Sequence, residues 1–147
     1  MRFLIQSVDQ AGVTIENHTT SIQRWILVYI AIARDDIEDY EPKIEKFVHR
    51  LHRAKLLQSL DGTISSSLTE IKGEILLISN FTLYGENKKW NKINFSKSAN
   101  FKDAQKIYQQ LKTKLQRNFP LVKTGKFGAM MTIDATNVWP INYVRDF

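Results

Sequence analysis

The sequence predicts an α+β fold. Several apolar strand patterns occur along the chain, but only two segments have helical spacing. Strands and helices do not alternate regularly, which is unlike a doubly wound parallel sheet. The length of 147 residues, with 43% hydrophobic and 11% aromatic residues, suits one core of ordinary size. We therefore expect a single domain over residues 1–147.

The first part of the chain has the pattern of three strands. Arg2 to Val8 has the composition of a strand, Asp9 to Gly12 that of a turn, and Val13 to Ile15 that of a short return strand. Trp25 to Ile32 is a continuous run of aromatic, β-branched and other apolar residues. Such a run predicts a central strand covered on both faces.

A first helix is predicted from about Glu38 to Leu51. Apolar residues recur there at helical spacing and would form one buried face, namely Ile44, Phe47, Val48 and Leu51. Asp35 or Asp36 is placed to cap the start, and Pro42 is tolerated because it falls in the first turn. The expected helix is amphipathic and packs on a sheet.

The second half predicts a strand, a helix and further strands. Glu74 to Leu83 is strongly apolar and leads into Tyr84-Gly85. A helix is expected from Phe101 to Arg117, with Asn100 as its N-cap and a buried stripe of Phe101, Ala104, Tyr108, Leu111 and Leu115. The segment from Val122 to Val144 then has strand composition, interrupted by Gly125, Gly128 and Pro140.

Positive charge predominates. The chain has 21 Lys and Arg against 15 Asp and Glu, a formal net charge of +6 and a pI near 9.6. This balance favours a polyanionic partner only weakly, because many basic proteins bind no nucleic acid. Most of the excess falls after residue 85, at Lys88, Lys89, Lys92, Lys97, Lys102, Lys106, Lys112, Lys114, Arg117, Lys123 and Lys126. One face is therefore expected to be positive.

Several classes of chemistry and location are disfavoured. The chain has no cysteine, which excludes disulfides, thiolate zinc sites and cysteine nucleophiles. The apolar run at the N-terminus is too short for a signal peptide, and Trp25 to Ala33 is about half the length of a membrane-spanning helix. We expect a soluble cytoplasmic protein without a membrane partner.

Two histidines, His49 and His52, lie three residues apart on the first predicted helix. A metal site would need a further ligand, and the neighbouring Arg50 and Arg53 would repel a cation. A solvated polar face is the better interpretation, so no metal site is predicted.

The first chemical motif is Ser79-Asn80-Phe81-Thr82-Leu83-Tyr84-Gly85. Taken alone, it is an ordinary strand end that passes into a turn at a glycine. The second motif is Thr124-Gly125-Lys126-Phe127-Gly128-Ala129-Met130-Met131, which taken alone is a glycine-rich turn leading into a core strand. The third is Asn137-Val138-Trp139-Pro140-Ile141.

Together these motifs resemble the D-aminoacyl-tRNA deacylase family, and the resemblance extends over essentially the whole chain. It implies a compact sheet-rich, barrel-like domain with two packed helices, assembled as a homodimer whose active site is shared across the interface. The implied activity is proofreading in translation, by hydrolysis of the ester that joins a D-amino acid or glycine to tRNA. The resemblance implies no metal or organic cofactor.

The resemblance also implies roles for particular residues. Asn80, Phe81 and Thr82 take the catalytic place, where the backbone N–H groups of Phe81 and Thr82 would face the ester oxyanion. Thr82 is expected to have a positioning role and not to act as the nucleophile, since no base lies near it in the sequence to activate its hydroxyl. The substrate-binding residues carried over are Phe95, Ser96, Phe127, Gly128, Ala129, Met130, Trp139 and Pro140.

The partner implied is the aminoacylated 3′ end of tRNA, and no DNA. Aromatic faces and flanking lysines suit a single-stranded end, because stacking and phosphate attraction tolerate any sequence. Lys88, Lys89 and Lys92 are the RNA-binding residues expected on this basis, although alone they would be interpreted as a solvated loop.

Two positions depart from the family's pattern. Asn80 stands where the family usually has Gln, and Trp139 where it has the Gly of a cis Gly-Pro pair. In the family this pair enters the partner's active site and leaves no room for an L side chain. The departures favour an alternative, a protein that binds the RNA end or an aminoacyl-adenosine-like ligand with lost or redirected hydrolysis. A third hypothesis is a fold retained only for protein association, which predicts no affinity for aminoacyl-adenosine.

Overall fold

The computed structural model describes residues 1–59, 61–89 and 92–147, with only the backbone described for Lys88, Lys89, Trp139 and Pro140. The strands in these residues are β1 (Arg2–Ile15), β2 (His18–Ile22), β3 (Trp25–Ala31), β4 (Leu57–Gln58), β5 (Ile64–Ser66), β6 (Glu74–Ser79), β7 (Glu86–Lys89), β8 (Lys92–Asn94), β9 (Val122–Thr124) and β10 (Thr132–Asp146). The helices are α1 (Tyr40–Arg53) and α2 (Phe101–Asn118), with the short 3-10 helices η1 (Arg34–Asp36) and η2 (Phe81–Tyr84).

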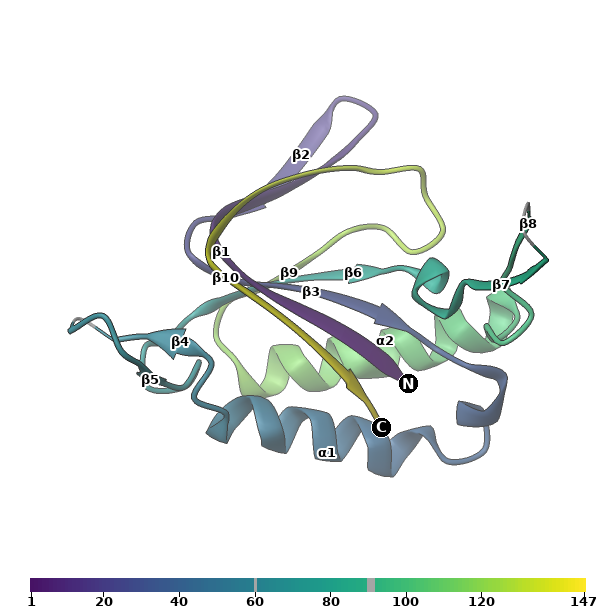
Figure 1. Ribbon diagram of the computed structural model, residues 1–147, viewed down its shortest axis with the longest axis horizontal. Helices are drawn as coiled ribbons and strands as arrows, with labels where there is room; N and C mark the ends of the chain where they lie inside the picture. Colours follow the sequence, from purple (N-terminus) through teal and green to yellow (C-terminus); the bar gives the residue numbers. More distant parts are fainter. Residues whose placement is uncertain (60, 90–91) are drawn as a thin grey trace.

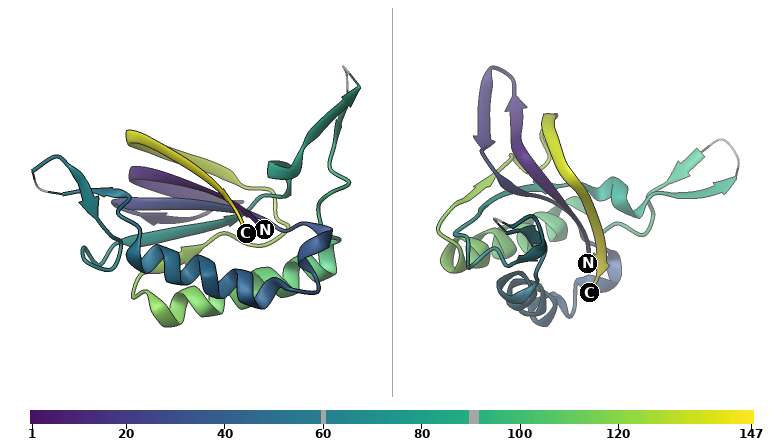
Figure 2. Two further views of the ribbon diagram at one scale, coloured as in Figure 1. Left: turned by 60° about the horizontal axis from the view of Figure 1, so that its bottom comes forward. Right: turned by 60° about the vertical axis from the view of Figure 1, so that its left-hand side comes forward.

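The main sheet has the strand order β10-β1-β3-β6-β9, and β2 pairs with β1. β1 is antiparallel to its neighbours, whereas β3, β6 and β9 run parallel. Both α-helices lie against one face of this sheet (Figure 1). The sheet curves strongly, and the β4–β5 and β7–β8 hairpins project from opposite ends of the molecule (Figure 2). The predicted α+β class is confirmed.

The central strand was predicted correctly, because it packs on both faces. Val28 of β3 belongs to the larger core between the sheet and the helices, and its neighbour Leu27 belongs to a smaller core on the opposite face. In the larger core, the ring of Phe3 stacks on that of Phe47 at a centroid distance of 3.7 Å. A strand with two buried faces needs apolar residues at every position, which is the pattern of Trp25 to Ile32.

The predicted turn from Asp9 to Gly12 is wrong. β1 continues through it to Ile15, and the return strand is β2 instead. Ala11 and Val13 remain buried in the smaller core, so the strand alternation persists past the polar pair Asp9-Gln10. The pairing of β1 with β10 shifts register on both sides of Val8. A bulge of this kind bends a strand without ending it, which explains why turn-forming residues occur within β1.

The helix predictions are largely confirmed. The four predicted residues of α1 are buried, and Asn100 caps α2 by accepting a hydrogen bond from the Asp103 N–H at 3.0 Å. Phe101 was expected in the buried stripe of α2 but is 61% exposed, whereas Ile107 is buried. Neither Asp35 nor Asp36 caps α1, since Asp39 is its N-cap. No helix in the described part of the chain is long and apolar enough to cross a membrane.

Asp36 is a buried carboxylate whose side chain is only 3% exposed. It accepts hydrogen bonds from the Met1 ammonium group, from Lys43 at 2.8 Å and from the Ala33 N–H at 2.7 Å. Burial raises the pKa of Asp36, but these donors outweigh burial, so its pKa lies below the usual value. The ionised form is therefore favoured by folding, and it joins the start of β1 to the entrance of α1.

We expect Asp36→Asn to lower the free energy of unfolding at pH 7 by about 3 kcal/mol, as when one partner of a buried ion pair is removed. Because the folded pKa is lowered, the contribution of Asp36 is present above about pH 4 and is lost as the pH falls further. Urea unfolding at several pH values should therefore show wild type and variant converging in acid. Asp35→Asn, at the exposed neighbouring position, is the control. A constant difference between the Asp36 variant and wild type at every pH would contradict the assignment.

Candidate active site

A pocket of about 450 Å³ opens where the parallel strands β3 and β6 end. Asn80 and Phe81 of the first motif line it, together with Phe127, Gly128, Ala129 and Met130 of the second motif. Its floor is formed by residues 30–32, and one wall by the amino end of α2. Figure 1 shows η2 and this end of α2 at the same end of the sheet. The structure thus brings together two motifs whose first residues are 45 positions apart in the sequence.

The chain turns sharply at Asn80, so the predicted strand to Leu83 is wrong. β6 ends at Ser79, and residues 81–84 form the 3-10 helix η2 with Asn80 as its N-cap. The Asn80 N–H donates to the Ile30 carbonyl at 2.7 Å, which fixes the turn to the end of β3. Asn80 Oδ1 accepts hydrogen bonds from both the N–H, at 3.1 Å, and the hydroxyl of Thr82. Asparagine favours this turn because its side chain replaces a backbone acceptor.

The hydrogen bonds of this turn decide which donors remain available. The Thr82 N–H is taken by Asn80, so the expectation that it faces an oxyanion does not hold in this conformation. The Phe81 N–H opens a helix and has no acceptor among the described residues. Since the Oδ1 of Asn80 is fixed by Thr82, its Nδ2 group is the part of the amide left to donate. Asn80 and Phe81 therefore offer two neighbouring donors beside the pocket.

Side chains from distant elements hold η2 in place. Ser98 Oγ donates to the Phe81 carbonyl at 3.0 Å. Arg2 donates to the Leu83 carbonyl at 3.0 Å, pairs with Asp146 at 2.8 Å and lies over the Tyr84 ring at 4.9 Å. Tyr84 is half-buried, and this burial raises the pKa of its hydroxyl. These contacts hold η2 in one orientation and thereby fix the directions of its hydrogen-bond donors.

The second motif forms the opposite wall. Gly128 has a φ of +74°, and a Cβ built on it would lie 2.6 Å from the ring of Phe101. Phe127 packs against Phe101 and Tyr108, with ring centroids 5.2 and 5.3 Å apart. Glycine is needed at position 128 both for this backbone conformation and for the close approach of the ring.

The remaining predicted substrate and RNA residues lie at the edge of the pocket or beyond it. Phe95 packs edge-on against Phe81 with a centroid distance of 5.1 Å, but it does not line the cavity. Ser96 is exposed, and its N–H donates to the Asn94 side chain at 2.7 Å. Lys92 is exposed on β8, while the side chains of Lys88 and Lys89 on β7 lie outside the described residues.

The third motif lies at the other end of the sheet. Trp139 and Pro140 belong to β10, and their side chains are outside the described ones. The pairing with β1 jumps from Gln6–Asn142 to Val8–Asn137, so residues 138–141 bulge out opposite a single residue. Val138 and Ile141 adjoin Trp25 at the start of β3, whereas the pocket lies at Ile30 and beyond. Five residues of extended strand separate these ends by about 16 Å. Every described peptide bond is trans.

The rim of the pocket is unusually apolar. Phe81, Phe101 and Met130 line the pocket yet are 58%, 61% and 93% exposed. Ile93 on β8, 62% exposed, extends this apolar surface near Gly85 and Phe95. Two residues of the site could not be found from the sequence: Phe101, which its helical spacing assigned to the core, and Ser98, whose role depends on a contact 17 residues away.

No ionisable side chain is among the described residues that line the pocket. His52 is engaged elsewhere: it hydrogen-bonds to Thr69 and Asn118 and stacks on Phe119, so the interpretation as a merely solvated face is wrong for it. Nowhere in the described residues do three or more His, Cys, Asp or Glu side chains form a group that could hold a metal ion. The chemistry available at the pocket is that of oriented dipoles and apolar surfaces.

The family described as D-Tyr-tRNA(Tyr) deacylase matches residues 4–146. The chain belongs to this family. A D-aminoacyl-tRNA deacylase of Prosthecochloris aestuarii (strain DSM 271 / SK 413) is 34% identical over 148 residues, which cover 99% of each chain. Another, of Bacillus pumilus (strain SAFR-032), is 31% identical over 147 residues, which cover 99% of this chain and 98% of that relative.

Two solved structures are similar to this chain in fold. One described as c-Myc DNA Unwinding Element Binding Protein superposes with a TM-score of 0.89 at 28% identity, covering 100% of this chain and 99% of that one. A probable eukaryotic D-amino acid tRNA deacylase superposes with a TM-score of 0.84 at 18% identity, covering 99% and 98%, which is a likeness of fold. The predicted family and barrel-like fold are confirmed.

The wall formed by Gly128 can be tested with a matched pair of variants. Gly128→Ala and Gly62→Ala each place a side chain at a positive φ, but at Gly62 the nearest atom is 3.6 Å from the new Cβ. We expect each to lose about 1–2 kcal/mol of stability in denaturant unfolding, from backbone strain. Only Gly128→Ala should also displace Phe101 and weaken binding of an aminoacyl-adenosine analogue. Equal binding by both variants would show that Phe101 does not shape the site.

Proposed function

We propose that this protein hydrolyses the ester bond of D-aminoacyl-tRNA, and of glycyl-tRNA, as a chiral proofreading step in translation in the cytoplasm. The observation that carries the proposal is the meeting of the first two motifs at one pocket, with two oriented donors at its edge. The relatives named above are D-aminoacyl-tRNA deacylases, and the sequence similarity covers nearly their whole length. We expect the reaction to require no metal or organic cofactor.

The proposed mechanism places the ester carbonyl against Asn80 and Phe81. The Asn80 Nδ2 and Phe81 N–H groups would donate hydrogen bonds to the oxygen as it gains negative charge. Donors fixed beforehand are effective because they do not reorganise during the reaction. A water molecule would attack the carbonyl carbon, with the 2′-hydroxyl of the terminal ribose assisting proton transfer. Thr82 serves as a positioning residue, since its N–H and hydroxyl fix the Asn80 amide.

The apolar rim suits the 3′ end of an RNA. Phe81, Phe101 and Phe127 present aromatic surfaces on which an adenine base can stack. The β7–β8 hairpin projects beside them and carries Lys88, Lys89 and Lys92, which we assign to phosphate contacts. Phe95 supports Phe81 from behind, and Ser96 would contact the RNA from outside the cavity.

A homodimer would complete this site. The rim exposes three large apolar side chains together, Phe81, Phe101 and Met130, and a contiguous apolar patch of this kind can mark an interaction site. The Trp139-Pro140 bulge lies too far from the pocket of its own chain to reach it. A second copy can bring its bulge to that rim, where the main-chain carbonyls would accept hydrogen bonds from the α-amino group of the substrate.

Two departures from the family pattern, Asn80 and Trp139, favoured binding without hydrolysis, and Asn80 no longer supports this alternative. Asn80 is shorter than Gln, but it lines the pocket and keeps an amide group free to donate. Trp139 remains the only departure in its favour, and the assays below separate the two functions.

The direct test measures release of D-tyrosine, glycine and L-tyrosine from their tRNA esters against a no-enzyme control. We expect release of the first two only. Asn80→Asp keeps the cap acceptor but replaces the Nδ2 donor by a charged oxygen, so the rate on D-tyrosyl-tRNA should fall by about 10²–10³ without loss of thermal stability. Asn94→Asp makes the same change outside the pocket, at another asparagine whose Oδ1 accepts a backbone N–H two residues further along the chain. Background rates for the wild type at high concentration would refute the proposed hydrolysis.

Trp139→Gly tests the third motif. We expect the wild type to spare L-tyrosyl-tRNA and the variant to gain no activity, because main-chain carbonyls do not depend on the side chain. The variant should lose about 0.5–1 kcal/mol in thermal unfolding, the usual cost of glycine within a strand. Sedimentation of both proteins should give dimers at micromolar concentration. An increase in turnover on D-tyrosyl-tRNA would show instead that the tryptophan ring obstructs the pocket.

A further inference from the structure

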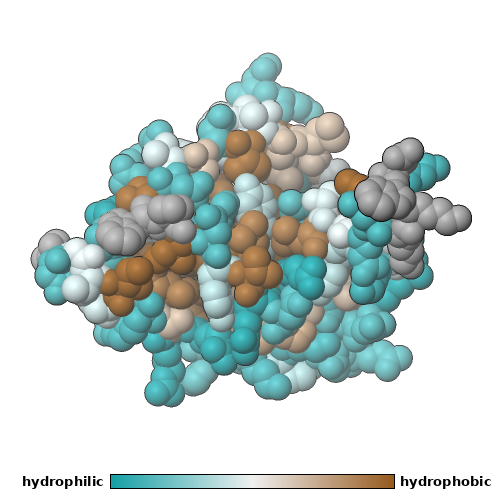
Figure 3. Space-filling model, in the orientation of Figure 1, coloured by the Kyte–Doolittle hydropathy of each residue, from teal (hydrophilic) through white to brown (hydrophobic). Residues whose placement is uncertain are grey.

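One face of α2 carries positive and polar side chains only. Lys102, Lys106, Gln109, Thr113 and Arg117 follow one another at intervals of three or four residues, which places them on one side of the helix. We call these five residues the basic stripe. The acidic residue of α2, Asp103, is tied to the N-cap Asn100 at 2.7 Å. Along the helices, the surface of the molecule is hydrophilic (Figure 3).

The three cations of the basic stripe are not neutralised by the protein. Among the described residues, no carboxylate lies within ion-pairing distance of Lys102, Lys106 or Arg117, whereas the neighbouring Lys114 pairs with Glu45. Lys106 lies over the Tyr40 ring at 5.8 Å, which leaves its charge accessible. Exposed cations in a row without ion-pair partners create a positive potential that attracts a polyanion.

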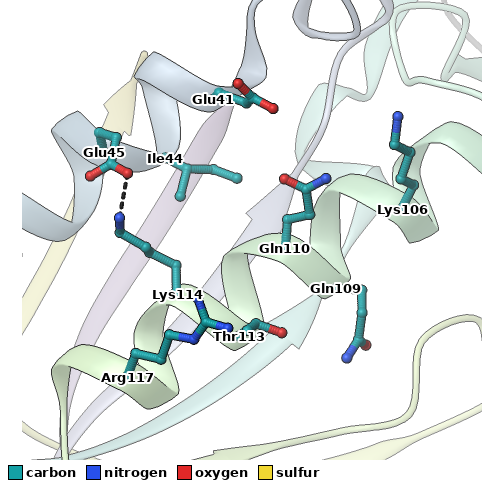
Figure 4. Close-up of a pocket in the computed structure, with 9 residues that line it drawn as sticks. All are labelled: Glu41, Ile44, Glu45, Lys106, Gln109, Gln110, Thr113, Lys114 and Arg117. Carbon is teal, nitrogen blue, oxygen red and sulfur yellow. Dashed lines mark hydrogen bonds and ion pairs between the residues drawn. The ribbon is translucent and has the colours of Figure 1, made fainter.

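A groove of about 550 Å³ runs between α1 and α2 along this face. Figure 4 shows Lys106 and Arg117 at its two ends, with Gln109, Gln110 and Thr113 between them on α2. Glu41 and Glu45 of α1 border the other side. Phosphates would be repelled by that side, so an RNA backbone is confined to the α2 side. Glutamine and threonine side chains there can donate hydrogen bonds to phosphate or ribose oxygens.

The basic stripe begins one residue after the candidate active site. Phe101 and Ala104 of α2 line the pocket, and Lys102 stands between them in the sequence. From Lys102 to Arg117 the helix rises about 22 Å. An RNA whose 3′ end enters the pocket would therefore find a row of cations leading away from it.

We propose that the basic stripe binds the phosphate backbone of the tRNA acceptor arm and so positions the aminoacylated 3′ end in the pocket. The inference rests on the proposed tRNA substrate but concerns a surface outside the catalytic pocket. It predicts that the stripe contributes to recognition of the tRNA body and not to hydrolysis of the ester. An acidic protein partner is the competing occupant.

The test uses the double variant Lys106→Glu/Arg117→Glu and the control Lys46→Glu/Lys72→Glu, which changes net charge equally at exposed positions elsewhere. Affinity for uncharged tRNA is measured by fluorescence anisotropy over a range of salt concentrations. We expect the stripe variant to bind about tenfold more weakly, with a salt slope smaller by about 1.4–1.8 as two phosphate contacts are lost. The control should match the wild type.

A second measurement separates this surface from the catalytic proposal. With D-tyrosyl-tRNA, the stripe variant should show a KM raised about tenfold at unchanged kcat. With D-tyrosyl-adenosine, which has no phosphate for the stripe to bind, variant and wild type should be equal. If both double variants weakened tRNA binding equally, the effect would come from net charge alone, and the proposal would be overturned. Unchanged binding by the stripe variant would also overturn it and leave the face for a protein partner. Failure of the wild type to hydrolyse either ester would refute the proposed function, while the binding measurement still decides the stripe.

Discussion

The hydrogen bond from the Asn80 N–H to the Ile30 carbonyl is the contact on which the candidate site depends. It joins the ends of two parallel strands that are buried on both faces, so its position is set by the whole core. From this point the chain leaves the sheet and turns into η2. This turn determines the positions of the pocket floor, the hydrogen-bond donors and the aromatic rim. Strand ends suit functional sites because the sheet behind them is rigid.

The described residues that line the pocket include polar groups but no ionisable side chain. Its donors are a side-chain amide and a backbone N–H, and their directions are set by hydrogen bonds from Thr82, Ser98 and Arg2. Such an arrangement works through preorganised dipoles, and it keeps the surrounding walls free for aromatic contacts with a base. It also explains why sequence patterns that seek a base beside a nucleophile find nothing here.

Periodicity predicted the elements whose burial is uniform along their length. β3 is buried on both faces, and α1 and α2 each bury one stripe. The spacing of hydrophobic residues in the sequence indicates both patterns directly. It failed where tertiary contacts override local preference: Asp9 and Gly12 favour a turn, but pairing with β2 and β10 carries β1 through them. Phe101 has core spacing, yet it stands at the pocket rim because the chain of the second motif passes beside it. The motif residues were found through family resemblance, while their meeting at one pocket required the fold.

The bulge of residues 138–141 and the pocket lie at opposite ends of β3. In the proposed two-fold pair, each molecule is therefore both donor of a bulge and acceptor of one, and two equivalent sites arise from two chains. A chain defective only in its pocket and a chain defective only in its bulge would each be inactive alone. Mixed together, they would form heterodimers containing one wholly intact site and one doubly damaged site. In the proposed dimer, the separation of these two features along a single strand would therefore allow two differently defective chains to restore activity in a mixed dimer.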